Sequence, residues 1–185
     1  EDFTVGKALL KTIEELDMSK SLEGDIRVIC FTWLKTSTKK NSLSIADYLE
    51  FLCQNQAITS DELFKFAEKV NPVNNAAVNG ICMLVAEGKE SITRVLNSVK
   101  NSILPPSSLI RLSTVCPELC NENLELFVEL AKTSNHPAQQ ESIRALGSGW
   151  AERSVIEPIL RRLTDSESEI VRNTATSQLR QIRMR

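Results

Sequence analysis

Two cysteines separated by three residues come nearest to a metal motif in this sequence. Cys116 and Cys120 have a spacing that zinc sites use, but a structural zinc site needs two further soft ligands. No second cysteine pair of this kind and no pair of histidines accompanies them. We therefore expect no metal and interpret both residues as buried or half-buried thiols at the start of a helix.

Acid–base chemistry through histidine would depend on His136, because it is the only histidine. Nucleophilic catalysis needs a Ser or Cys beside a base that a third group orients. No Gly-x-Ser-x-Gly turn accompanies His136, which precedes Pro137 in a loop. Gly147 and Gly149 lead into Trp150 rather than into a Lys-Ser/Thr helix start, so they do not form a phosphate-binding loop. We expect no catalytic residue, no cofactor and no enzymatic activity.

The basic residues are unevenly distributed along the chain. No lysine follows Lys132, whereas eight arginines and only six acidic residues do. Arginine is suited to bidentate contacts with carboxylates and phosphates. Arg161, Arg162 and Arg180 project from the later turns of predicted helices, which makes them candidate partner-binding residues. The alternative is that they complement helix C-termini and neighbouring acids.

The composition is that of an ordered and nearly neutral chain. Its 185 residues are 42% hydrophobic and 25% charged, with only 6 Gly and 6 Pro. The 22 basic and 24 acidic residues give a net charge of −2, which excludes the strongly basic surface of a dedicated nucleic-acid-binding protein. Five cysteines, an odd number, favour a reducing, intracellular location, cytoplasmic or nuclear.

No apolar run approaches the ~20 residues that a membrane-spanning helix needs, so we expect no membrane association. The sequence begins with Glu1 and shows no signal peptide. We expect it to be part of a longer protein.

Helical periodicity covers the chain, whereas strand signals are weak. In the clearest stripe, Ile92, Val95, Leu96 and Val99 recur at helical spacing, and Ser91 is the expected N-cap. Short helices with wide apolar faces are not stable alone and must pack on their neighbours. We predict about eleven helices, over residues 5–17, 22–36, 44–54, 60–70, 74–86, 92–102, 107–114, 122–133, 138–147, 154–163 and 168–182.

These helices recur with a period of about 32 residues, which is typical of stacked two-helix units. An offset of 33 pairs Leu146 with Leu179, and an offset of 63 pairs Leu96 with Ile159. These offsets are close to one and two times the period.

The C-terminal residues follow an ordered pattern. Ala145-Leu146-Gly147 closes one helix, a Val-x-x-Leu-like stripe with an early Pro158 forms the next, and Asp165 precedes a Val171-Arg172 segment. Gly147 is expected to end its helix in the left-handed conformation. Pro158 is expected in the first turn after a Ser154 cap, where its missing N–H costs no hydrogen bond.

Over residues 137–182 this pattern resembles the HEAT repeat, in the short form also seen in phycobilin lyases. With the helical pattern it predicts an all-α fold, an α-solenoid of antiparallel helix pairs in a HEAT-like or ARM-like superhelical stack. We expect one helical-repeat domain over 1–185, less regular over 1–73 and HEAT-like over 74–185. The resemblance implies that the second helix of each unit lines the concave face, which adds Arg94 to the candidate residues.

The predicted function is that of a non-enzymatic scaffold or adaptor that binds a partner protein or peptide in a surface groove. The arginines favour an acidic partner. Three alternatives remain open: a nucleic-acid-binding HEAT-like module, an enzyme of the phycobilin lyase type, which the resemblance alone implies, and a regulatory or sensor region of a multidomain ATPase or kinase that packs on its own parent chain.

Overall fold

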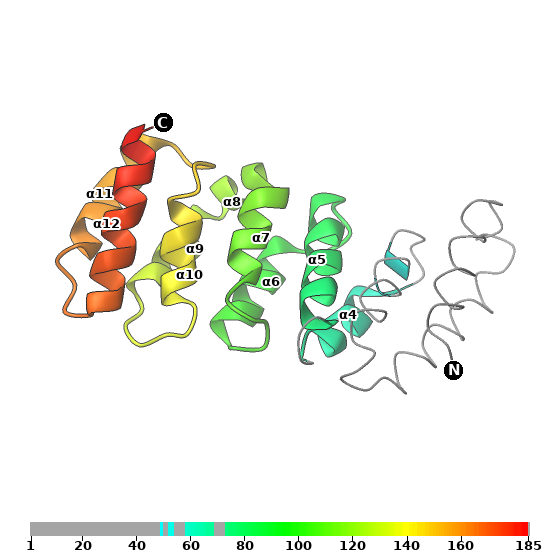
Figure 1. Cartoon of the computed structure of the whole chain (residues 1–185). Coiled ribbons are helices and arrows are strands. Elements are labelled where there is room, and N and C mark those ends of the chain that lie inside the picture. The colour runs from blue at the N-terminus through cyan, green and yellow to red at the C-terminus, as the bar shows by residue number, and fades with distance from the viewer. Residues whose placement is uncertain (1–48, 50–51, 54–57, 69–72, 185) are drawn as a thin grey trace, which may run out of the picture. The chain divides into compact units, whose positions relative to one another are not determined.

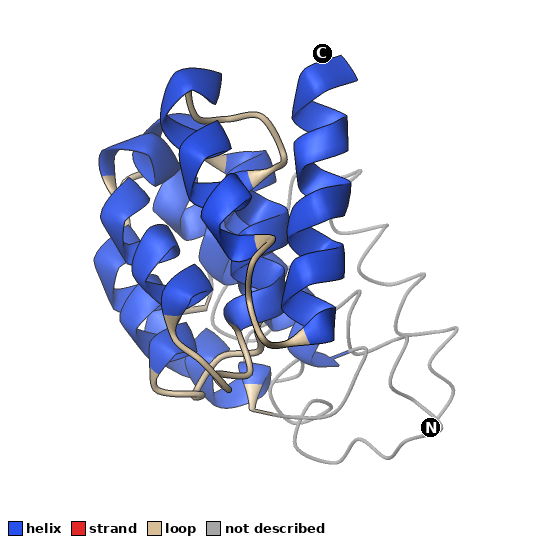
Figure 2. Ribbon diagram, turned by 90° about the vertical axis from the view of Figure 1, so that its left-hand side faces the viewer, coloured by secondary structure: helices blue, strands red, loops and turns tan. Residues whose placement is uncertain are grey.

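The computed structural model of the chain is helical and contains no strand among the residues that it describes (Figures 1 and 2). The predicted all-α fold is therefore confirmed for this part of the chain. The predicted helices over 5–17 and 22–36, and most of the one over 44–54, lie outside it. The described residues are 49, 52–53, 58–68 and 73–184.

The helices follow the predicted order, with one addition. A six-residue helix, α8, lies between the predicted helices over 107–114 and 122–133, and Pro117 occupies its first turn, where a missing N–H costs no helical hydrogen bond. No helix of the described residues is long and apolar enough to cross a membrane. The bounds are α4 Ser60–Ala67, α5 Val73–Ala86, α6 Ile92–Lys100, α7 Ser108–Val115, α8 Pro117–Glu122, α9 Leu124–Lys132, α10 Gln139–Leu146, α11 Arg153–Leu163 and α12 Glu169–Met184.

The chain divides into two compact units, residues 1–81 and 82–185, with the boundary inside α5. The described part of the first unit includes α4, which begins with a capping box. The backbone N–H of Thr59 donates to the Glu62 carboxylate at 2.9 Å, and the N–H of Glu62 donates to the Thr59 hydroxyl at 3.4 Å. These two bonds satisfy amides that the first turn leaves without helical partners.

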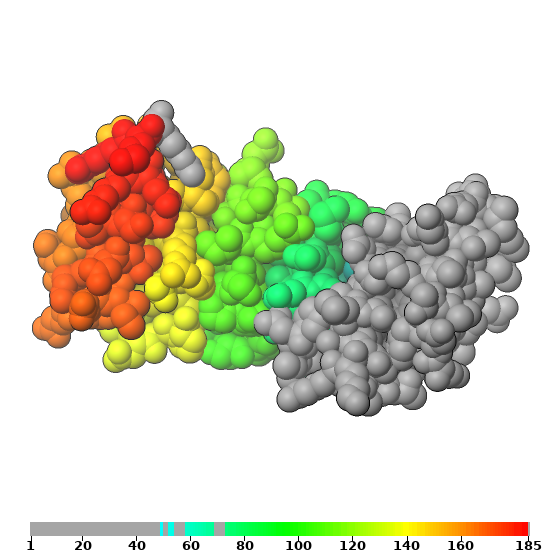
Figure 3. Space-filling view, in the orientation of Figure 1, coloured from blue at the N-terminus to red at the C-terminus, as the bar shows by residue number. Residues whose placement is uncertain are grey.

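Helices of the second unit lie in two rows. In the first row, α10 packs against both α7 and α12, and the side chains of these three helices form a continuous surface in Figure 3. In the second row are α6, α9 and α11, which pack against α7, α10 and α12 respectively. Within the second row, α6 also contacts α9. The core lies between the rows and contains Phe127 and Leu130 of α9 and Ile143 and Leu146 of α10.

Gly147 serves a different purpose from the predicted one. Its φ of −82° is right-handed, so the prediction of a left-handed helix end is wrong. Its missing side chain instead lets α12 approach, because a Cβ on Gly147 would meet the Gln178 amide oxygen and lie 2.6 Å from the Gln178 Cβ. The positive φ falls on Gly149, at 94°.

The start of α11 also differs from the prediction. Glu152, not Ser154, is the N-cap, because its extended backbone directs its carbonyl to the N–H groups of Val155 and Ile156, at 3.0 and 3.1 Å. Pro158 therefore lies inside the helix rather than in its first turn, and it has no N–H to donate to the Ser154 carbonyl. At the start of α6, Ser91 is the N-cap as predicted, but its hydroxyl makes no capping hydrogen bond.

Burial refines the register between α6 and α11. The offset of 63 pairs the buried Leu96 with the half-buried Ile159. An offset of 64 pairs Leu96 with Leu160, and both side chains are at most 1% exposed. The spacing between the two helices is therefore twice the predicted period.

Candidate binding groove

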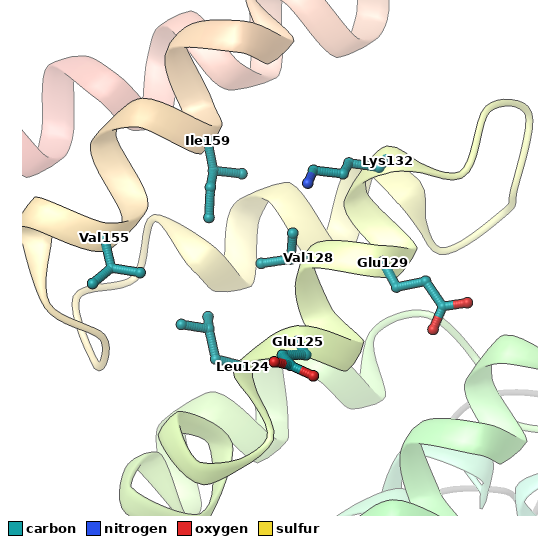
Figure 4. Close-up of a pocket in the computed structure, with 7 residues that line it drawn as sticks. All are labelled: Leu124, Glu125, Val128, Glu129, Lys132, Val155 and Ile159. Carbon is teal, nitrogen blue, oxygen red and sulfur yellow. The ribbon is translucent and has the colours of Figure 1, made fainter.

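A groove lined mainly by apolar side chains runs between α9 and α11 (Figure 4). Leu124 and Val128 of α9 form one wall, and Val155 and Ile159 of α11 form the other. The volume of the groove is about 460 Å³. Leu124 lies beside Val155, and Val128 lies beside Ile159, so the two helices run in the same direction along the groove.

These apolar side chains lie outside the buried core. In α9, Phe127, Leu130 and Ala131 are buried between the rows, whereas Leu124 and Val128 remain only half-buried. Each helix therefore has an apolar surface wider than its core contacts require.

On α11 the same division separates neighbouring residues. Ile156 and Leu160 are buried, whereas Val155 is 44% exposed and Ile159 is half-buried. An apolar surface that the fold leaves uncovered is typical of an interaction site.

Trp150 anchors the loop that leads into α11. Its indole N–H donates to the Ala145 carbonyl at 2.6 Å, and its ring packs against Phe127 of α9, with centroids 5.1 Å apart. Trp150 is therefore a packing residue. Through Phe127, Trp150 connects the loop before α11 to α9, the helix that forms the other wall.

Three charged side chains of α9 also line the groove. Glu129 pairs with Lys100 of α6 at 2.6 Å. Glu125 and Lys132 have no ion-pair partner among the residues that the structure describes. They lie near opposite ends of α9, so the two ends of this wall differ in charge.

The four arginines predicted to bind a partner lie on three helices. Arg94 of α6 pairs with Glu90 at 2.9 Å, and Arg161 of α11 pairs with Glu157 at 2.6 Å. Arg162 and Arg180 are exposed, and the described part of the chain offers neither of them an ion-pair partner. The structure does not collect the four residues into one site.

A different set of arginines lies around Glu157. It accepts from Arg153 at 3.1 Å and Arg161 at 2.6 Å on its own helix, and Arg183 of α12 lies 3.4 Å away. The hydrogen bonds from Arg161 and Arg153 lower the pKa of Glu157 to about 2. Three guanidinium groups around one carboxylate leave a local excess of positive charge. The i, i+4 spacing could have predicted the pairs within α11, but Arg183 is 26 residues away.

The cysteines near α8 are packing residues at a helix start, as expected. Cys116 is the N-cap of α8, and its thiol donates to the Leu112 carbonyl at 3.3 Å. Burial raises the pKa of Cys82 to about 12, whereas the hydrogen bond between Cys116 and Cys120 lowers the pKa of Cys116 and raises that of Cys120. In the described residues, no three His, Cys, Asp or Glu side chains are arranged to hold a metal ion.

His136 ties a loop to the end of α6. Its Nδ1 accepts from the Ala138 N–H at 3.1 Å, so the proton lies on Nε2, which is 2.8 Å from the Lys100 carbonyl oxygen. Both ring nitrogens therefore have backbone partners. The side chain satisfies a carbonyl that the helix C-terminus leaves without a helical donor.

Comparison of the chain with protein-family models, curated proteins and solved structures found no match. The groove is therefore defined by its geometry alone. Sequence analysis assigned no binding role to Leu124, Val128, Val155 or Ile159, although their apolar character beside residues of the core face was a visible signal.

Proposed function

We propose that this chain is a non-enzymatic interaction module of HEAT-like helix pairs that binds an apolar segment of a partner protein between α9 and α11. The observation that carries the proposal is the half-exposed apolar lining of the groove by Leu124, Val128, Val155 and Ile159. Covering such a surface is favourable by ~25 cal/mol for each Å² of apolar area removed from water. The module acts as a scaffold or adaptor.

The solenoid architecture is part of this proposal. Two rows of helices in the second unit, and a spacing of twice the repeat period between α6 and α11, support stacked helix pairs. In such a stack, each row presents successive helices side by side. A groove between neighbouring helices of one row then forms a binding site without any large rearrangement of the fold.

The apolar groove is stronger support for a protein partner than the arginines are for a nucleic acid. A nucleic-acid interface needs basic side chains free to contact phosphates. Arg153, Arg161 and Arg183 are already paired with Glu157, so a phosphate would have to compete with its carboxylate for them. An acidic partner at Arg162 and Arg180 stays a prediction.

The test is a selection of displayed natural protein segments on the full chain, repeated with Val128→Asp and with Ile170→Asp. Val128 lines the groove, whereas Ile170 is 62% exposed on α12 and does not. We expect enriched segments whose binding is lost with Val128→Asp and kept with Ile170→Asp. Equal enrichment on all three proteins would contradict the proposal. So would binding of DNA or RNA at about 50 mM salt with no enriched protein segment.

A further inference from the structure

The two helices that form the walls of the groove carry unpaired charged residues in the same order. Along α11, Val155 and Ile159 line the groove, whereas the N-cap Glu152 and the last-turn residue Arg162 lie beyond them at the two ends of the helix. Along α9, Glu125, Val128 and Lys132 fall at i, i+3 and i+7. Apart from Glu129, which pairs with Lys100, each helix has an acidic residue near its start, apolar residues in the groove and a basic residue near its end.

The parallel direction of the helices brings like charges to the same end. Leu124 lies beside Val155, so Glu125 and Glu152 belong to the end where both helices begin. Lys132 points over the groove on the Ile159 side, and Arg162 lies in the last turn of α11, so the basic residues belong to the end where both helices finish (Figure 4). The unpaired charges at the two ends of these helices are therefore acidic at one end of the groove and basic at the other.

These four charges are not neutralised by a neighbouring charge, although Glu152 accepts a hydrogen bond from the Ser154 hydroxyl. Each side chain is exposed, and among the described residues none of the four has an ion-pair partner. By contrast, Glu129 and Glu157 are already paired and therefore cannot define the polarity of the site. The apolar lining between the two charged ends includes the half-buried Val128 and Ile159, one from each wall.

We propose that the groove binds an amphipathic α-helix that runs antiparallel to α9 and α11. This inference rests on the proposed function and specifies its partner. Helices favour acidic residues in the first turn and basic residues in the last. A helix with that common arrangement matches the groove in one direction only, with its acidic N-terminus at Lys132 and Arg162 and its basic C-terminus at Glu125 and Glu152.

The dimensions fit a short helix. The nine residues of α9 span roughly 13 Å at 1.5 Å per residue. A partner helix of about 12 residues with apolar side chains at i, i+4 and i+7 covers this length. Its apolar stripe contacts Val128 and Ile159, and its charged ends contact Glu125 and Lys132 in the groove and Glu152 and Arg162 beside it.

The experiment is a selection from a designed library of helical peptides of about 12 residues. The apolar positions i, i+4 and i+7 are fixed, and the end positions encode Asp, Glu, Lys, Arg or Ala. Peptides are selected on the full chain and counter-selected on Val128→Asp. We expect recovered sequences with acids in the first turn and bases in the last. Exchanging these ends in a recovered peptide should weaken binding about tenfold, which corresponds to ~1.4 kcal/mol.

A charge-exchanged protein is the matched control, because acidic first turns also stabilise a helix by themselves. Glu125→Lys with Lys132→Glu reverses one wall and leaves the net charge unchanged. The preference for acidic N-termini should fall by at least threefold on this variant. Groove-dependent peptides with no charge order, or with an order that the exchange does not affect, would overturn the inference and leave the proposed function standing. No enrichment over Val128→Asp would overturn both.

Discussion

The helix α9 forms two junctions within its row, and they differ in what lies between the helices. On one side, α6 contacts α9, Lys100 pairs with Glu129 at 2.6 Å, and the Thr93 hydroxyl donates to the Asn123 side-chain oxygen at 3.4 Å. On the other side, α9 and α11 are separated by the groove, whose walls carry apolar side chains and which no ion pair crosses in the described residues.

This difference shows that a repeated helix position does not determine a repeated contact. An offset of 64 relates α6 to α11 in sequence and in burial of their core face. The side chains beside the core face then decide whether a junction is closed by polar contacts or remains open as an apolar groove. A binding site in a helical stack is therefore a property of one junction rather than of the period.

The largest effect on stability is expected in α9, between a residue of the core and a residue of the groove. Phe127 is fully buried and contacts Trp150, so Phe127→Ala should lower the free energy of unfolding by about 3–5 kcal/mol. Val128→Ala should cost less than about 1 kcal/mol, because that side chain is only half-buried at the groove. Denaturant unfolding of both variants measures the contrast. Equal losses would mean that the groove side of α9 is part of the core.

The next largest effect is expected in the first row, where α10 packs directly against α12. Gly147→Ala places a methyl group against Gln178, and we expect a loss of about 1–3 kcal/mol in unfolding free energy from overpacking. Trimming the neighbour with Gln178→Ala should recover part of that loss. If the double variant loses more unfolding free energy than the two single variants together, close packing of α10 on α12 is not the reason for this glycine.

A smaller effect is expected from the ion pair that closes the α6–α9 junction. Both side chains are more than 40% exposed, so the pair should contribute about 0.2–1 kcal/mol and weaken with salt. A double-mutant cycle of Lys100→Ala and Glu129→Ala at low and high salt measures this coupling. A coupling of zero at low salt would leave helix packing and the Thr93–Asn123 bond to close the junction.

The smallest effect is expected at Glu157 of α11, outside the groove. Its pKa of about 2 in the folded protein lies below its ordinary value of 4.5. The stability that its ion pairs contribute is therefore present above about pH 4.5 and is lost as the pH falls toward 2. The stability difference between the protein and Glu157→Gln should shrink over this range. A difference that is constant with pH would contradict the pairing with Arg153 and Arg161.

Local sequence signals predicted the helices better than the contacts between them. The stripes of α6, α9 and α11 gave their bounds to within a few residues, because each helix has a periodic apolar face. The six residues of α8 are too few to show a period. Gly147 was misinterpreted because its requirement comes from Gln178, which lies on a different helix, α12. The groove between α9 and α11 was not predicted, because the partial exposure of Val128 depends on where α11 lies.

The central claim is that the open α9–α11 junction is the binding site. The most direct measurement is methyl NMR of the full chain during titration with a peptide from the helical library. We predict shifts at Leu124, Val128, Val155 and Ile159, and none at Ile170 or Met184, which are exposed on α12. Shifts centred on Ile170 and Met184, with the groove methyls unchanged, would contradict the account.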